Sequence, residues 1–285
     1  MIVPIVRRAV GCALVGITAL ALSSCASAER SRPYPQALVS ELAQLRSPDG
    51  LFHDPGARAD QGTLHITYLT ARLIPEDFAS IAGSSTIGAV KDALAGDVLS
   101  AQARVEAVAV LRLAGDPSWQ EEARASRPAI DAVVGSSVPQ SELARTVAFI
   151  DAARVLDDDL ARPRLEPFAA SSPEDARDAR LAISDADMFA DGDTVETSFP
   201  TVTADLAAQA ARPRDPAADW VTGLQAAAVS GAAPDAHSDA ASALASLRGC
   251  PSFPDLYRAS WSDPESCDLS VTRSAIDSGL AYQRP

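Results

Sequence analysis

The chain has 285 residues, 47% of them hydrophobic, and a formal net charge of −14 at pH 7. This length and composition suffice for one large domain with a substantial buried core, or for two small domains. A chain this acidic is repelled by nucleic acid and by anionic lipid headgroups, so we expect no nucleic-acid partner.

The first 24 residues have the three parts of a secretory signal. Arg7 and Arg8 form a positively charged start, and an apolar stretch follows over residues 9–22. At about 1.5 Å per residue, this stretch is too short to cross a hydrocarbon core of roughly 30 Å as a helix. We therefore interpret residues 1–24 as a cleavable signal, whose removal would change the net charge from −14 to −16.

The sequence Leu22-Ser23-Ser24-Cys25 resembles the lipobox of bacterial lipoproteins, in which an aliphatic residue and two small residues precede a cysteine. In that family signal peptidase II cleaves before the cysteine, which then carries acyl chains such as palmitate. The resemblance implies lipidation of Cys25 and anchoring to the extracytoplasmic face of the cell membrane. Multiple acyl chains hold a protein firmly, whereas a single chain binds only marginally. The alternative is a plain cleavable signal with a cysteine nearby by chance.

Two other cysteines, Cys250 and Cys267, remain after this processing, because Cys12 would leave with the signal. Two cysteines in an exported chain are expected to pair, and closing a loop of this length stabilises a fold by about 3 kcal/mol in the chain-entropy model. The alternative is a zinc site, which lacks a nearby histidine. We therefore predict a disulfide.

The rest of the chain has the pattern of a helical protein. Residues 25–34 are small and polar and are interpreted as a tether. Over residues 35–285, apolar residues recur at helical spacing, alanine is frequent, and no run of β-branched residues alternates with polar ones. We predict a single all-α domain of about a dozen helices.

Several helix boundaries are marked by glycine or proline. The predicted helix over residues 99–113 is followed by Gly115, which is typical of a helix end. Serine or aspartate followed by proline is typical of a helix start. This pair occurs at residues 116–117, 172–173 and 215–216, and helical apolar stripes also occur in residues 139–156 and 220–229.

One acidic segment, residues 185–200, breaks this pattern and is poor in helix formers. Its aspartates, Asp185, Asp187, Asp191 and Asp193, have the oxygen-rich chemistry that calcium prefers. However, the glycine and glutamate that an EF-hand places at its sixth and twelfth positions are absent. We interpret the segment as a solvated acidic loop, with a calcium site as the alternative.

A helix, loop and helix recur in outline at the two ends of the chain. Residues 42–46 match residues 244–248, and a phenylalanine follows each, Phe52 and Phe253. Each copy then reaches a helix that opens with Leu-x-x-Thr. These openings are Leu64–Thr67 and Leu269–Thr272, with a third echo at Leu143–Thr146. Such repetition indicates units that bury their apolar faces against one another.

The stretch "LRSPDGLF…TLHITYLTARL", within residues 45–73, resembles the repeat of the α/α-toroid family, which includes terpenoid cyclases, protein prenyltransferase β-subunits and squalene-hopene cyclases. The resemblance is clear over residues 38–74 and weaker over residues 241–282. It implies an α/α-toroid-like array of helical hairpins around a central cavity. The Asp-x-Asp-Asp acid of the cyclases is absent, since "LDDDL" at residues 156–160 has different spacing, and so is the zinc set of the prenyltransferases.

The candidate pocket residues are His53, His65 and Tyr68. The two histidines lie on either side of a turn rich in glycine and proline, so the chain can bring them together. Two histidines alone do not make a zinc site, and a structural or surface role is the alternative. We predict no catalytic residue, no metal ligand and no cofactor.

These observations favour a lipid-anchored extracytoplasmic protein that acts as a binding or interaction module, with the membrane as its partner through Cys25. One alternative is an enzyme on a terpenoid cyclase or prenyltransferase-like scaffold, and another is a structural lipoprotein of the cell envelope. A pocket that gathers the two histidines, Tyr68 and distant acids would favour the enzyme. A pocket of alanine and leucine would favour apolar ligand binding or mere packing.

Overall fold

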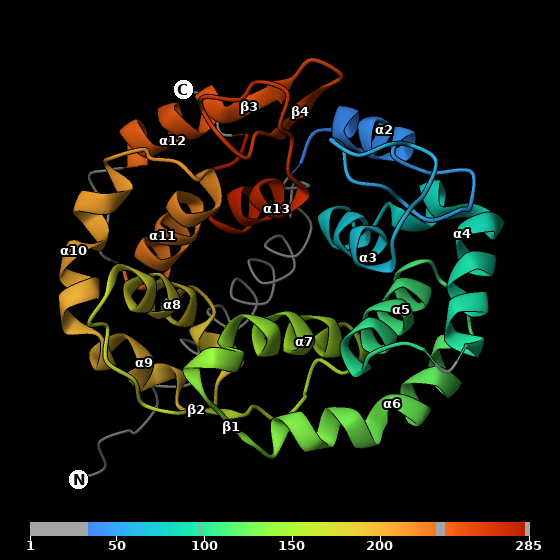
Figure 1. The fold of residues 1–285 in the computed structure, drawn as a ribbon, viewed down its shortest axis with the longest axis horizontal. Coiled ribbons are helices and arrows are strands. Elements are labelled where there is room, and N and C mark those ends of the chain that lie inside the picture. The colour runs from blue at the N-terminus through green and yellow to red at the C-terminus, as the bar shows by residue number, and fades with distance from the viewer. Residues whose placement is uncertain (1–33, 97, 232–236, 283–285) are drawn as a thin grey trace, which may run out of the picture. The chain divides into compact units, whose positions relative to one another are not determined.

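The computed structural model describes residues 34–96, 98–231 and 237–282. The expected signal, the expected lipidation site Cys25 and nearly all of the expected tether lie outside the described residues. The described chain is mostly helical and adds only two short two-stranded sheets, which agrees with the predicted all-α class (Figure 1). No helix in this part of the chain is long and apolar enough to span a membrane.

The helices and strands follow one another through short connections. In chain order they are α2 (Gln36–Gln44), α3 (Leu64–Leu73), α4 (Phe78–Ala95), α5 (Ala101–Leu113), α6 (Trp119–Val134), β1 (Ser137–Val138), η1 (Gln140–Glu142), α7 (Leu143–Leu156), β2 (Arg164–Leu165), α8 (Pro173–Ser184), η2 (Ala186–Met188), α9 (Gly192–Ser198), α10 (Pro200–Ala210), α11 (Ala217–Val229), α12 (His237–Leu247), β3 (Arg248–Cys250), β4 (Phe253–Tyr257) and α13 (Leu269–Asp277). Strands β1 and β2 pair in parallel, and β3 and β4 pair antiparallel.

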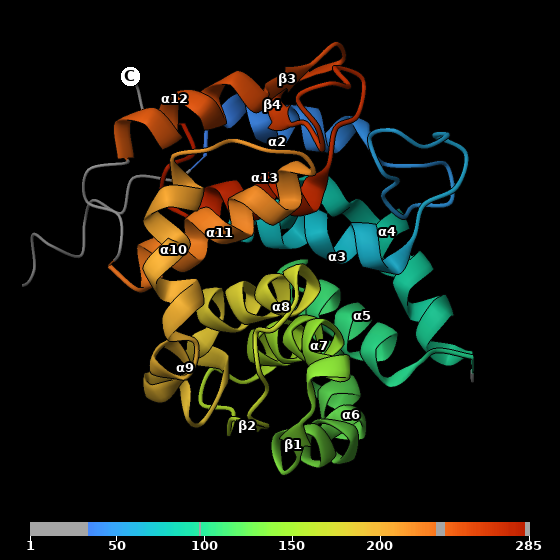
Figure 2. The same ribbon diagram turned by 60° about the vertical axis from the view of Figure 1, so that its left-hand side comes forward.

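Within residues 34–282 the helices form an inner and an outer set. Helices α3, α5, α7, α8, α11 and α13 lie toward the centre of Figure 1, and α2, α4, α6, α9, α10 and α12 lie outside them. Each inner helix contacts the next one in chain order, and α13 also contacts α3. The contacts among inner helices therefore form a closed circuit, and Figure 2 shows the same helices turned by 60°.

Local sequence signals account for several of these boundaries. Helix α5 starts after Ser100, whose hydroxyl accepts a hydrogen bond from the backbone N–H of Ala103 at 3.2 Å. The chain turns after the helix at Gly115, where φ is +75° and favours glycine. Helix α8 starts with a capping box between Ser172 and Asp175. These boundaries agree with the predicted ones.

The prediction of an acidic loop at residues 185–200 is wrong, because much of this segment is helical. It contains η2 and α9. The turn between them is compact, and a Cβ atom on Gly192 would lie 2.1 Å from the carbonyl oxygen of Ala186. Phe189 and Val195 are buried within the segment. Burial of these apolar side chains outweighs the low helix propensity of their neighbours.

The two ends of the chain share a hydrogen-bonded loop-to-helix motif. The Thr67 hydroxyl accepts from the backbone N–H of Phe52 at 2.9 Å and donates to the carbonyl oxygen of Thr63 at 2.7 Å. The Thr272 hydroxyl accepts from the backbone N–H of Tyr257 at 2.9 Å and donates to the carbonyl oxygen of Asp268 at 2.8 Å. The two segments that the sequence comparison matched therefore share this pattern of hydrogen bonds.

The equivalent of Phe52 is Tyr257, not the Phe253 that the sequence comparison matched to it. Arg46 pairs with Phe52 in the first copy, whereas Arg248 pairs with Tyr257 in the second. The loop of the second copy is thus longer. A comparison by sequence spacing alone therefore matches Phe253 to Phe52, although Tyr257 has the equivalent position.

The Asp49-Gly50 turn of the first copy packs closely against α4. Gly50 has φ +90°, and a Cβ atom there would lie 2.5 Å from the carbonyl oxygen of Ser85. The Thr86 hydroxyl donates to the carbonyl oxygen of Gly50 at 2.6 Å. Only glycine fits both the backbone angle and this close approach.

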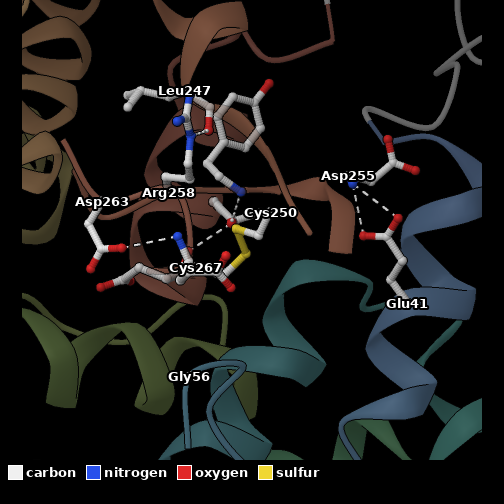
Figure 3. The surroundings of a disulfide bond; sticks show 12 residues. Glu41, Gly56, Leu247, Cys250, Asp255, Arg258, Asp263 and Cys267 are labelled. Carbon is white, nitrogen blue, oxygen red and sulfur yellow. Dashed lines mark hydrogen bonds between the residues drawn. A yellow bond between two sulfur atoms is a disulfide. The ribbon is translucent and has the colours of Figure 1, made fainter. Parts of the chain in front are cut away.

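The second copy carries two further links, shown in Figure 3. Cys250 and Cys267 form the predicted disulfide, with their Cα atoms 6.0 Å apart. The carboxylate of Glu41, on α2, accepts the backbone N–H of Asp255 with both oxygens, at 3.0 and 2.9 Å. These last two bonds join the first described helix to strand β4.

Candidate ligand-binding cavity

A cavity of about 400 Å³ lies among the inner helices. Its lining residues come from all six of them and from the turn after α8. They are His65, Tyr68 and Leu69 of α3, Glu106 of α5, Ala144, Val147, Ala148 and Asp151 of α7, Leu181 and Ser184 of α8, Asp185 and Met188 after it, Thr222 and Gln225 of α11, and Ser270, Arg273, Ser274 and Asp277 of α13. This volume is within the range of small-molecule sites.

A buried carboxylate, Asp151, lies on the wall of the cavity and binds side chains from two other inner helices. Arg273 donates to it with both terminal nitrogens, at 2.7 and 2.6 Å, and Arg72 donates at 2.9 Å. The hydroxyl of Tyr68 also donates to it. Burial by itself would raise the pKa of Asp151, but the two guanidinium groups outweigh burial and hold this pKa well below its ordinary value. Asp151 is therefore an ionised structural anchor.

Three of the charged residues at this place share one position in the Leu-x-x-Thr pattern of the sequence. Arg72, Asp151 and Asp277 each stand eight residues after the leucine that opens a Leu-x-x-Thr helix. The Nε of Arg273 forms an ion pair with Asp277 at 3.4 Å. One register position in three inner helices thus supplies one cation and two anions to the centre.

A second polar pair joins α3 to α5. The Nδ1 of His65 lies 3.1 Å from Oε1 of Glu106, and Nε2 of Gln102 donates to the same oxygen at 2.9 Å. The Glu106 side chain is 3% exposed, whereas that of His65 is 51% exposed. The hydrogen bond to Glu106 raises the pKa of His65, because it favours the imidazolium form.

Two further carboxyl groups lie on the α8 and α13 sides of the cavity. Burial raises the pKa of Asp185 to about 6, and only a hydrogen bond from the Ser184 hydroxyl, at 2.8 Å, holds its carboxylate among the described side chains. Withdrawal from water also raises the pKa of Asp277, with Arg273 opposing the effect. Asp185 is thus an acid whose proton equilibrium lies close to neutral pH.

Two of the three predicted pocket residues line the cavity. His65 and Tyr68 both line the cavity. His53 is not among its lining residues. It is 6% exposed, its Nδ1 lies 2.8 Å from the carbonyl oxygen of Asp54, and its backbone N–H donates to the carbonyl oxygen of Leu45. The loop pairing thus holds His53 away from the cavity, and the two histidines do not form one site.

Most of the charged groups of the cavity do not belong to the predicted set. Glu106 and Asp151 each lie on a helix in which most residues are apolar, Arg273 has Asp277 four residues after it, and Asp185 follows the end of a helix. A single charged residue on an otherwise buried face is a signal for such a site, since a buried charge needs a partner. The common eighth position after the leucine of the repeat is a second signal.

Within residues 34–96, 98–231 and 237–282, no group of three or more His, Cys, Asp or Glu side chains has the arrangement to hold a metal ion. Comparison with protein-family models, with curated proteins and with solved structures finds no match to this chain.

Proposed function

We propose that the chain is an extracytoplasmic lipoprotein, anchored to the membrane through Cys25, whose inner helices bind a small polar molecule in the central cavity. The anchor rests on the lipobox-like sequence Leu22-Ser23-Ser24-Cys25. The closed circuit of contacts among the inner helices supports an α/α-toroid arrangement. The single observation that carries the binding role is a cavity to which all six inner helices contribute.

The lining favours ligand binding over mere packing. A few polar groups on a largely apolar lining are typical of a small-molecule site. The side chains of Gln225, Ser270 and Ser274 line this cavity and form no hydrogen bond with other described residues. Gln225 and Ser274 are half-buried and Ser270 is exposed, so all three are accessible to a ligand.

The binding role is tested by extracting the purified mature protein and identifying bound small molecules by mass spectrometry. The variant Ala148→Trp fills the cavity with an indole ring and is expected to abolish ligand recovery. The matched control is Ala208→Trp, which adds the same ring at an exposed position on α10. If the wild-type protein and Ala148→Trp yield the same extract, the cavity is not a binding site.

The anchor is tested by fractionation of cells that express Cys25→Ala. We expect this variant to leave the membrane fraction, because the acylated residue is lost, and Cys12→Ala to stay there. Retention of Cys25→Ala in the membrane would contradict lipidation at this residue.

A second candidate function, an enzyme, is favoured by one observation. Asp185, with its pKa raised to about 6, is suited to donate a proton near neutral pH, and the His65–Glu106 pair lines the same cavity. Incubation of the protein with the molecule recovered by extraction distinguishes the two candidates, because a binding protein returns this molecule unchanged whereas an enzyme converts it. Conversion by wild type and its loss in Asp185→Asn would favour the enzyme.

A further inference from the structure

The charge balance of the central cavity indicates the class of its ligand. This inference rests on the binding role proposed above and concerns the chemistry of the ligand. The two arginines near the cavity, Arg72 and Arg273, are already engaged. All three guanidinium nitrogens of Arg273 contact carboxylates, two on Asp151 and one on Asp277. No free guanidinium of α13 therefore remains to bind an anion.

The carboxylate of Asp185 is in the opposite situation. It lines the cavity, yet no lysine, arginine or histidine among the described residues forms an ion pair with it. Glu106 is matched by His65, and Asp277 by Arg273. Arg273 also attracts Asp185 electrostatically, but its nitrogens contact Asp151 and Asp277 instead. A partly buried carboxylate without a directly bonded cation is costly, so a ligand that brings a positive charge would offset this cost.

Further hydrogen-bond acceptors lie on the helices next to Asp185. Gln225 on α11 and Ser270 and Ser274 on α13 line the cavity with side chains that make no hydrogen bond within the described chain. Helix α11 contacts both α8 and α13, so these residues belong to adjoining walls. An ammonium group donates three hydrogen bonds, and a carboxylate, an amide oxygen and a hydroxyl can accept them.

The other lining residues fit an apolar body. Leu69 comes from α3, Val147 and Ala148 from α7, Leu181 from α8, and Met188 from the turn that follows it. A ligand that combines a cationic head with a short hydrocarbon part matches both kinds of lining.

We propose that the central cavity binds a small organic cation, a primary amine with a short apolar body, and that Asp185 is the residue that receives its ammonium group. Gln225 and the two serines supply additional acceptors. Hydrogen bonds between ammonium and carboxylate are charge-assisted and about twice as strong as neutral ones, which gives selectivity over an alcohol of equal size.

The test compares three probes of equal chain length by isothermal titration calorimetry at pH 7.5, on the purified mature protein. The probes are hexylamine, 1-hexanol and hexanoate, which have six carbons each and carry a positive, a neutral and a negative head group. We expect hexylamine to bind with one site per chain and at least tenfold more tightly than 1-hexanol, with hexanoate the weakest. Equal affinity for the amine and the alcohol would overturn the proposal.

A pair of variants assigns the selectivity to Asp185. Asp185→Asn keeps the size of the side chain and removes its charge. We therefore expect the affinity for hexylamine to fall to the affinity for 1-hexanol. Asp158→Asn removes one charge from an exposed turn and is expected to leave the affinity unchanged. Circular dichroism checks that each variant is folded. Undiminished binding of hexylamine to Asp185→Asn would overturn the assignment.

The outcomes separate this inference from the binding role on which it rests. One outcome is that 1-hexanol binds as tightly as hexylamine and that Ala148→Trp abolishes this binding. It would refute the amine ligand but support the cavity as a binding site. Failure of all three probes, together with an extract free of ligand, would refute both.

Discussion

The two copies of the loop-to-helix motif, residues 42–73 and 244–277, share a pattern of hydrogen bonds and have different side chains at the centre. In both copies a threonine hydroxyl accepts the amide of the loop residue that pairs with an arginine. The positions that follow carry different chemistry. Tyr68 in the first copy stands where Arg273 stands in the second, and His65 stands where Ser270 does.

This difference shows which residues serve the scaffold and which serve the site. The threonines are fully buried and keep the loop on the helix in both copies. Tyr68 and Arg273 have different side chains, yet both donate to the single carboxylate of Asp151 on α7. The repeat therefore supplies equivalent positions around one centre, and the side chains at these positions define its chemistry.

Removal of the shared carboxylate is expected to have the largest effect. The side chain of Asp151 is only 7% exposed. Asp151→Asn would leave Arg72 and Arg273 without their common anion. We expect a loss of about 3–5 kcal/mol in the free energy of unfolding, measured by urea denaturation. Asp157→Asn, which breaks an exposed pair with Arg127, should cost about 0–1 kcal/mol. A similar small loss for Asp151→Asn would mean that the two arginines find other partners.

Loss of the disulfide is expected to weaken the second copy, which alone carries it. The double variant Cys250→Ser and Cys267→Ser releases a loop whose ends are 17 residues apart. We expect a decrease of about 3 kcal/mol in the free energy of unfolding. Reduction of the wild-type protein should reproduce this decrease, and reduction should not affect the double variant. An unchanged unfolding midpoint after complete reduction would contradict a stabilising role.

Substitution of the shared threonine tests the equivalence of the copies directly. Thr67→Val and Thr272→Val each remove the acceptor of a buried backbone N–H and should each cost about 1–3 kcal/mol. The control is Thr222→Val on α11, whose hydroxyl bonds only to a carbonyl within its own helix. Thermal unfolding of the three variants measures the effects. A large loss in one copy and none in the other would show that the motifs are similar in shape only.

The smallest expected effect is a pH dependence of the unfolding free energy, caused by His65 in the first copy. The folded-state pKa of His65 is raised, so its contribution is complete below the ordinary histidine pKa of about 6.5. The contribution is lost as the pH rises through the folded-state pKa. The difference in unfolding free energy between wild type and His65→Gln should therefore decrease with rising pH. A difference that is constant from pH 5 to 8 would exclude the pair with Glu106.

Sequence signals predicted the helix boundaries better than the site, for a physical reason. Ser172-Pro173 and Gly115 act within one turn of the chain, so the boundaries that they mark are visible locally. The pair of Tyr68 and Asp151 joins residues 83 apart in sequence, and no local pattern shows which inner helix faces which. His65 stands out in the sequence because histidine is rare in this chain, whereas Asp151 and Glu106 are common residue types.

The bond between Glu41 and strand β4 has a consequence for how the chain reaches its final structure. The carboxylate of Glu41 is buried, and the amide that it accepts lies 214 residues later. During synthesis the first helix of the domain is complete long before its partner emerges, so its closing contact must wait for almost the whole chain. Contacts of such high sequence separation slow folding. We therefore expect chains that are cut before residue 255 to expose the apolar face of α2 and to be targets for proteases and chaperones.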